Sequence, residues 1–171
     1  MNSPRTSFAI ILACLIFSPN IASPREVPEK PAKMHDVEML LIDKTNEYRK
    51  SNQLKLLSSN NKLNQAARNH ANVMIETNNF SHQAGDTQPS DRAEQAGYRW
   101  YFIAENIAWR SGDNLMSNEQ LADAILQQWI NSPGHNQNLL AKLALECGVS
   151  ITYDANSGRT YIVMLYARPR N

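Results

Sequence analysis

The segment over residues 60–77 constrains the fold most, because its apolar positions recur with the period of an α-helix. The stripe lies at i, i+3, i+4, i+7, i+8, i+11 and i+12 and consists of Leu63, Ala66, Ala67, His70, Ala71, Met74 and Ile75. Ser58 or Ser59 is suited to cap the helix start. A helix with one apolar stripe has to bury it against another layer of structure. The sequence therefore predicts a long helix that packs on a core.

The other segments predict a mixed fold. Further helices are expected over residues 35–51, 90–96 and 118–131, and one or two helical turns over 138–144. The aromatic and apolar run at 98–109 predicts a strand. A hairpin closes the chain, with strands over 149–153 and 161–167 and a turn at 155–158. Helices first, then a strand, a helix and a hairpin predict an α+β fold with helices covering an antiparallel sheet.

Residues 1–23 have the layout of a secretory signal peptide. A charged start at Arg5 precedes ten apolar residues (8–17), and the small residues Ala22 and Ser23 follow. Ten residues fall short of the ~20 needed to span a bilayer, and no later segment approaches that length. The chain is expected to be secreted or periplasmic. Cys14 ends a weak lipoprotein box at residues 11–14, which leaves lipid anchoring open as an alternative.

Removal of residues 1–23 leaves a neutral chain that begins with a charged, proline-rich tether over residues 24–34. Loss of Arg5 reduces the 17 basic residues to 16, which equals the 16 acidic residues. Without a basic stripe, nucleic acid is not an expected partner. Cys147 is then the single cysteine, so no disulfide forms within the chain and the core has to hold the domain, residues 35–171, together. We expect a monomer in which Cys147 is a buried apolar residue.

Three polar residues stand at exceptional places. His82 and His135 each follow a predicted helix end, in loops of the kind where binding residues concentrate. His135 comes directly after the Pro133-Gly134 break, which is expected to turn it back over the sheet. Glu105 lies inside the predicted strand at 98–109. Burying a carboxylate alone costs several kcal/mol, so Glu105 has to be paired, hydrogen-bonded or bound to a metal.

Spacing alone leaves two interpretations open. Two histidines and one glutamate form a common divalent-metal triad that keeps a position for water. Alternatively, each residue has a separate structural role, since 22 residues separate His82 from Glu105 and 29 separate Glu105 from His135. No short ligand pair such as HExxH is present. His70 is interpreted as a core histidine with one hydrogen bond to the backbone.

Six motifs, in this order, resemble the CAP superfamily (cysteine-rich secretory proteins, antigen 5 and pathogenesis-related proteins), also called SCP-like extracellular domains. They are Asn46…Arg49, Ala67-Arg-Asn-His-Ala-Asn-Val-Met74, Asn79-Phe-Ser-His82, Arg92…Ala96-Gly-Tyr98, Ala104-Glu-Asn-Ile-Ala108 and Trp129-Ile-Asn-Ser-Pro-Gly-His135-Asn-Gln-Asn-Leu139. Gly148-Val149 and the final hairpin complete a likeness over residues 35–168, and the short bacterial members are most alike.

The resemblance implies a three-layer α-β-α sandwich with a central antiparallel sheet. It also implies a cleft in which His82 and His135 bind a divalent cation, with zinc the first expectation, and in which Glu105 contributes to ligand binding. The sequence departs from eukaryotic members at Ser132, where they place a second glutamate, and it lacks their disulfides and cysteine-rich extension.

Three hypotheses for function follow. The favoured one is a secreted binding module whose cleft takes a divalent cation or a small polar ligand. The second is a metal-dependent hydrolase of peptides or esters, in which a metal activates water or Ser81 or Ser132 acts as nucleophile. Both serines lie at predicted helix ends, where local hydrogen bonding explains them equally well. The third is an envelope or host-interaction protein that acts through its surface loops.

Overall fold

The structure, a computed structural model, describes residues 32–112 and 116–170. The predicted signal peptide, including Cys14, and residues 24–31 of the predicted tether lie outside the described residues. The helices are α1 (Ala32–Ser51), α2 (Asn61–Thr77), α3 (Pro89–Gln95), α4 (Asn118–Ile130) and α5 (Pro133–Leu139). The strands are β1 (Ser58–Ser59), β2 (Trp100–Ser111), β3 (Glu146–Asp154) and β4 (Arg159–Pro169). No helix within the described ranges is long and apolar enough to cross a membrane.

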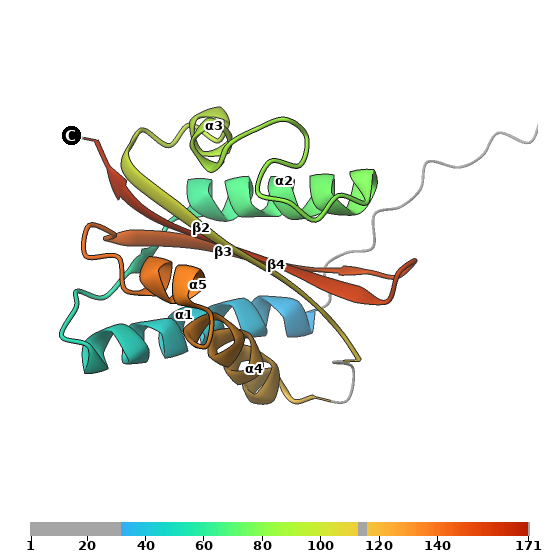
Figure 1. The fold of residues 1–171 in the computed structure, drawn as a ribbon, viewed down its shortest axis with the longest axis horizontal. Coiled ribbons are helices and arrows are strands. Elements are labelled where there is room, and N and C mark those ends of the chain that lie inside the picture. The colour runs from blue at the N-terminus through green and yellow to red at the C-terminus, as the bar shows by residue number, and fades with distance from the viewer. Residues whose placement is uncertain (1–31, 113–115, 171) are drawn as a thin grey trace, which may run out of the picture.

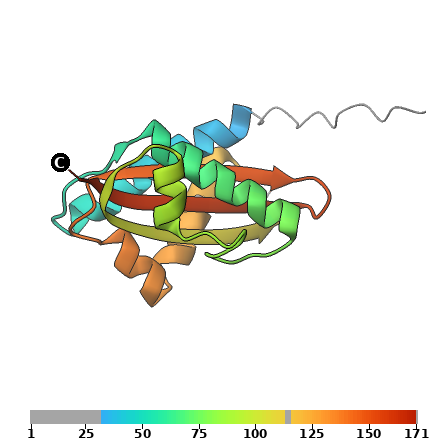
Figure 2. The same ribbon diagram turned by 90° about the horizontal axis from the view of Figure 1, so that it is seen from above.

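The sheet lies between two layers of helices, which confirms the predicted α+β sandwich. Its strand order is β1-β3-β4-β2, and β2 is an outer strand (Figure 2). Helices α2 and α3 cover one face, and α1, α4 and α5 cover the other (Figure 1). The β2–β4 and β3–β4 pairs are antiparallel as predicted, whereas the two-residue β1, absent from the sequence prediction, pairs with β3 in parallel.

Strand β4 divides the core into two clusters, one on each face of the sheet. Its even residues Ile162, Met164 and Tyr166 pack with α1, α4 and α5. Its odd residues, from Tyr161 to Leu165, pack with the apolar stripe of α2. An apolar strand covered on both faces belongs at the centre of a sheet, which explains its continuous run of buried residues.

Close contact between α2 and β3 fixes the position of the helix layer. A Cβ atom at Gly148 would lie 2.2 Å from the backbone carbon of Leu63, so only glycine fits there. The neighbouring Cys147 is fully buried, and burial raises the pKa of its thiol to about 12. The residue is therefore an unreactive part of the core, as the sequence predicted.

Several boundaries differ from the sequence prediction. Helix α1 begins three residues before the expected domain start at His35, and β2 is shifted two residues toward the C-terminus of the expected 98–109 strand. The largest difference is α5, which begins at Pro133, whereas helical turns were expected over 138–144. Proline fits the first turn of a helix because that turn needs no N–H from it. Pro133 therefore starts a helix, and His135 lies in its first turn rather than in a loop.

Candidate functional site

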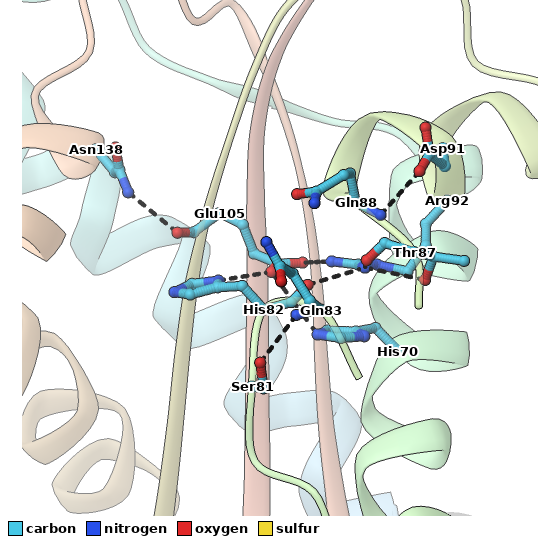
Figure 3. Close-up of polar contacts among 10 residues, drawn as sticks. All are labelled: His70, Ser81, His82, Gln83, Thr87, Gln88, Asp91, Arg92, Glu105 and Asn138. Atoms are coloured by element: carbon cyan, nitrogen blue, oxygen red, sulfur yellow. Dashed lines mark hydrogen bonds and ion pairs between the residues drawn. The ribbon is translucent and has the colours of Figure 1, made fainter. Parts of the chain in front are cut away.

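Glu105 is the centre of a buried polar network on β2. Its side chain is 1% exposed. One carboxylate oxygen, Oε1, lies 2.8 Å from His82 Nδ1, and the other, Oε2, accepts a hydrogen bond of 2.6 Å from Arg92 Nη2 (Figure 3). The prediction that this carboxylate needs partners is confirmed, because both oxygens are engaged. A buried charge is tolerated when it is paired and hydrogen-bonded in this way.

Arg92, a residue of α3 to which the sequence analysis gave no role, supplies the charge that balances Glu105. It is itself buried. Its second terminal nitrogen, Nη1, donates to the carbonyl oxygens of Thr87 (2.6 Å) and His82 (3.1 Å). Arg92 therefore ties the loop between α2 and α3 to β2 and holds the backbone of His82. Two sequence signals point to it, the need of Glu105 for a cation and the place of Arg92 at the start of the fourth family motif.

His82 has one ring nitrogen held and one left over. A carboxylate accepts hydrogen bonds and does not donate them, so the contact with Glu105 places the proton on Nδ1. In the neutral ring, Nε2 then carries the lone pair, and no hydrogen bond to it is found in the described part of the chain. The side chain is 48% exposed. This nitrogen is free to bind a ligand from solvent.

His135 approaches the same region from α5, on the opposite face of the sheet. Its carbonyl oxygen accepts a hydrogen bond of 3.0 Å from the side chain of Asn106, a buried residue of β2. Burial and, to a smaller extent, the charge of His82 lower the pKa of the His135 ring. The His82 ring and the His135 carbonyl thus contact adjacent residues of β2, Glu105 and Asn106, although 52 residues separate the two histidines in the sequence.

Asn138 completes the connection between α5 and β2. Its amide nitrogen donates to the Glu105 carbonyl (3.0 Å) and to the Asn106 side chain (2.9 Å) (Figure 3). Asn138 therefore holds α5 against β2, whereas Asn136 accepts from the hydroxyl of Tyr48 in α1 (3.0 Å).

Arg49, a residue of α1, fixes the C-terminal end of α5. The guanidinium is fully buried and donates to the carbonyl oxygens of Leu139 (2.7 Å) and Ala141 (3.1 Å). These are the unpaired carbonyl groups that follow a helix end. Arg49 thus places α5, and with it His135, relative to α1.

His70 lies behind the network, as a buried core residue, which was predicted. Its Nε2 is 3.8 Å from Glu105 Oε1 (Figure 3). Neither ring nitrogen makes a hydrogen bond of good geometry within the described ranges, although the Ser81 backbone lies close enough to the ring to favour its protonated form. Burial lowers the pKa of His70 to about 4, with Glu105 opposing the shift. His70 is therefore neutral at pH 7.

The structure does not support a three-ligand metal triad. Among residues 32–112 and 116–170, no three His, Cys, Asp or Glu side chains are arranged to hold a metal. Glu105 faces Arg92 and His82, so its role is to orient His82 rather than to bind a cation itself. This leaves His82 and His135 as the two residues that could serve as ligands.

Neither candidate serine is arranged as a nucleophile. Ser81 Oγ accepts from the backbone N–H of Gln83 (3.1 Å), which is the local bonding expected for it. Ser132 precedes α5, and its side chain makes no capping hydrogen bond. No hydrogen bond joins either serine to His82 or His135 in the portion described.

The His82 side chain is about half exposed, so solvent reaches the site. Two surface hollows, with volumes of about 290 and 540 Å³, lie elsewhere. The first borders α1 and α2 near Glu38 and Arg68, and the second borders Lys62 and Glu146. Neither hollow includes His82, Glu105 or His135, so the polar network is the feature that marks the candidate site.

An α-β-α sandwich that carries two neighbouring histidines over an outer strand defines an extracellular-type SCP domain. The chain belongs to the CAP family, described as the cysteine-rich secretory protein family, whose sequence model matches residues 42–166.

Several of the similar proteins are bacterial. The uncharacterized protein YkwD of Bacillus subtilis is 27% identical over 111 residues, which cover 64% of this chain and 40% of that protein. An extracellular SCP-domain protein of Bacillus anthracis is 26% identical, with a TM-score of 0.66 over 79% of this chain and 41% of that one. An outer surface protein of Borrelia burgdorferi shares the fold at 19% identity, with a TM-score of 0.71 over 83% and 98% of the two chains.

Proposed function

We propose that this CAP-domain protein binds a divalent cation, with zinc as the first choice, through His82 and His135. The observation that carries the proposal is the bond from His82 Nδ1 to Glu105. Metal-binding histidines characteristically donate their second ring nitrogen to a carboxylate, which fixes the tautomer and makes the ligating nitrogen more basic. His82 has this arrangement, with Nε2 on the solvent side.

The state of His135 also favours cation binding. Its lowered pKa keeps the ring neutral at pH 7, and only a neutral imidazole has a lone pair for a metal. Imidazole ligands suit zinc among the common divalent cations. With two protein ligands, the remaining positions go to water or to a group of a bound partner. The proposal is a binding function, since within the described residues neither Ser81 nor Ser132 is hydrogen-bonded to His82 or His135.

Calorimetric titration of Zn²⁺ into residues 24–171 at pH 7.5 tests the proposal. One site per chain is expected, and His82→Ala is expected to abolish it. His35→Ala is the matched control, because His35 is an exposed histidine outside the network, and its loss should leave the titration unchanged. Equal binding by wild type and His82→Ala would overturn the cation site.

We further infer that the protein is exported, on the strength of the signal-peptide pattern in residues 1–23. The intact mass of the protein recovered from its native host tests this. Cleavage near Ala22 or Ser23 is expected. A mass that corresponds to a lipid-modified Cys14 would show membrane anchoring, and an uncleaved chain in the cytoplasm would contradict export.

A further inference from the structure

The free edge of β2 carries alternate backbone groups that point away from the sheet. Leu145 N donates to Ala167 O, so the odd residues of β4 direct their backbone groups toward β3 and the even residues direct theirs toward β2. Even residues of β4 pair with even residues of β2, such as Asn106 with Met164 and Ala108 with Ile162. The N–H and C=O groups of the odd β2 residues therefore face outward. The bond from Asn138 to the Glu105 carbonyl agrees independently.

The two outer edges of the sheet differ in how these groups are satisfied. Along β3, the N–H of Val149 donates to the Asn64 side chain (2.9 Å), and the N–H of Ile151 donates to Glu38 (2.7 Å). Side chains from α2 and α1 thus cap that edge. Along β2, capping stops at Glu105. The outward groups of the next odd residues, Ile107, Trp109 and Ser111, have no hydrogen-bond partner among the described residues.

Exposed aromatic rings lie beside this uncapped stretch. Trp109 pairs across the ladder with Tyr161, whose ring centre is 6.4 Å from that of Phe80. Trp109 and Phe80 are each 41% exposed, whereas Ile107 is almost covered, so the edge opens toward Ser111. The Arg159 guanidinium packs over the indole at 4.5 Å and holds the ring there. A strand added at this edge would place one of its side chains about 5 Å from Trp109.

We propose that residues 107–111 of β2 bind an extended segment of another polypeptide as an additional strand, with an apolar side chain against Trp109. A peptide backbone offers donors and acceptors at the same spacing as the unpaired groups, which is the basis of strand addition. A second copy of the chain is not the expected occupant. The uncapped stretch is five residues long and spans about 17 Å. Each side of a stable dimer interface contributes roughly 20–30 residues, which is far more.

This surface adjoins His82 and His135 but does not depend on a cation, so its test is made in EDTA. The probe is the peptide Ac-Lys-Thr-Val-Thr-Val-Thr-Lys-NH2, which is soluble and favours an extended backbone. The control is the same peptide with N-methyl groups on its five central residues, which keeps the side chains and removes the donors. Amide hydrogen exchange of the ¹⁵N-labelled full chain is followed by NMR.

In the free protein, we expect the amides of Ile107 and Trp109 to exchange at least tenfold faster than those of Asn106 and Ala108, which face β4. Millimolar probe should slow exchange at Ile107 and Trp109, and the N-methylated control should not. Unchanged exchange with the probe would overturn the proposal. Protection already present without probe, together with a doubled mass in light scattering, would assign the edge to a second copy and overturn it equally.

A pair of variants separates the apolar contact from folding. Trp109→Thr keeps the backbone and a strand-forming residue, and it should weaken the probe at least tenfold. Tyr153→Thr removes a comparably exposed ring from β3, on the far edge, and should leave probe binding unchanged. Equal weakening in both variants, with unchanged amide spectra elsewhere, would contradict a contact specific to Trp109.

Discussion

The ring nitrogen Nδ1 of His82 lies 2.8 Å from Glu105 Oε1, so an exposed imidazole is held by a carboxylate that is itself out of contact with water. The same carboxylate binds Arg92 through its other oxygen. Loop, helix and strand therefore meet at one buried charge. Changes to this charge are expected to affect both the stability of the fold and the orientation of His82.

Glu105→Gln removes the buried charge while keeping the shape of the side chain. Arg92 then remains buried without a counter-ion, which costs about 3–5 kcal/mol in comparable cases. We expect a loss of that size in the free energy of unfolding, measured by urea denaturation at pH 7.5. Glu94→Gln, at an exposed glutamate of α3, should change stability by less than about 0.5 kcal/mol. Equal effects from the two variants would show that the network does not hold the fold.

Arg92→Lys keeps the positive charge but loses the planar group that contacts Glu105 and two carbonyl oxygens at once. We expect a loss of about 1–3 kcal/mol, because lysine leaves buried acceptors without donors. The Zn²⁺ affinity should fall as well, since the backbone of His82 is released. Arg68→Lys on the exposed side of α2 is the control. Wild-type stability and affinity in Arg92→Lys would argue against the positioning role.

The pKa of His70, lowered to about 4 from an ordinary 6.5, predicts a pH dependence of stability. Between these values the unfolded chain binds a proton at His70 and the folded chain does not, so stability falls as the pH drops from 6.5 toward 4. The full loss of folding stability is roughly 3 kcal/mol, and no loss from this group is expected above pH 7. Unfolding of wild type and His70→Leu should be compared at pH 7.5, 6 and 5. A parallel decline in both proteins would assign the dependence to other groups.

The two glycines Gly148 and Gly134 should respond oppositely to alanine. At Gly148 the new Cβ would meet the backbone of Leu63, so Gly148→Ala should cost more than about 3 kcal/mol or prevent folding. At Gly134, in α5, a Cβ meets nothing within 4 Å, and alanine should be neutral or stabilise by up to about 1 kcal/mol. Thermal unfolding of both variants measures the difference. A tolerated Gly148→Ala would mean that α2 can move away from β3.

The layers of the fold could be predicted from the sequence because they follow from periodicity. The stripe of α2 and the continuous apolar run of β4 each have one way to be buried. The start of α5 was missed because Pro133-Gly134 is equally typical of a turn and of a first helical turn. Strand β1 is only two residues long, which is too short for a recognisable sequence pattern, so its pairing with β3 was not predicted.

The site was predictable in part. Glu105 was found because a carboxylate in an apolar strand demands a partner, and the structure places His82 against it. The prediction of its partners was incomplete, because Arg92 supplies the balancing charge and Arg92 has the appearance of any polar residue of a short helix. Asn106 is missed for a similar reason, because asparagine serves loops throughout the chain and only the fold reveals which asparagines bridge two elements.

The ion pair of Glu105 with Arg92, and the bond of the same carboxylate to His82, have an evolutionary consequence. Any lineage that replaces Glu105 or Arg92 loses stability, whether or not the site is still used. These residues should thus persist among descendants that have abandoned the ancestral ligand, and their retention is a record of fold maintenance. His135, whose Nδ1 has no hydrogen-bond partner in the described part of the chain, is where genetic drift should be seen first once the ligand is no longer needed.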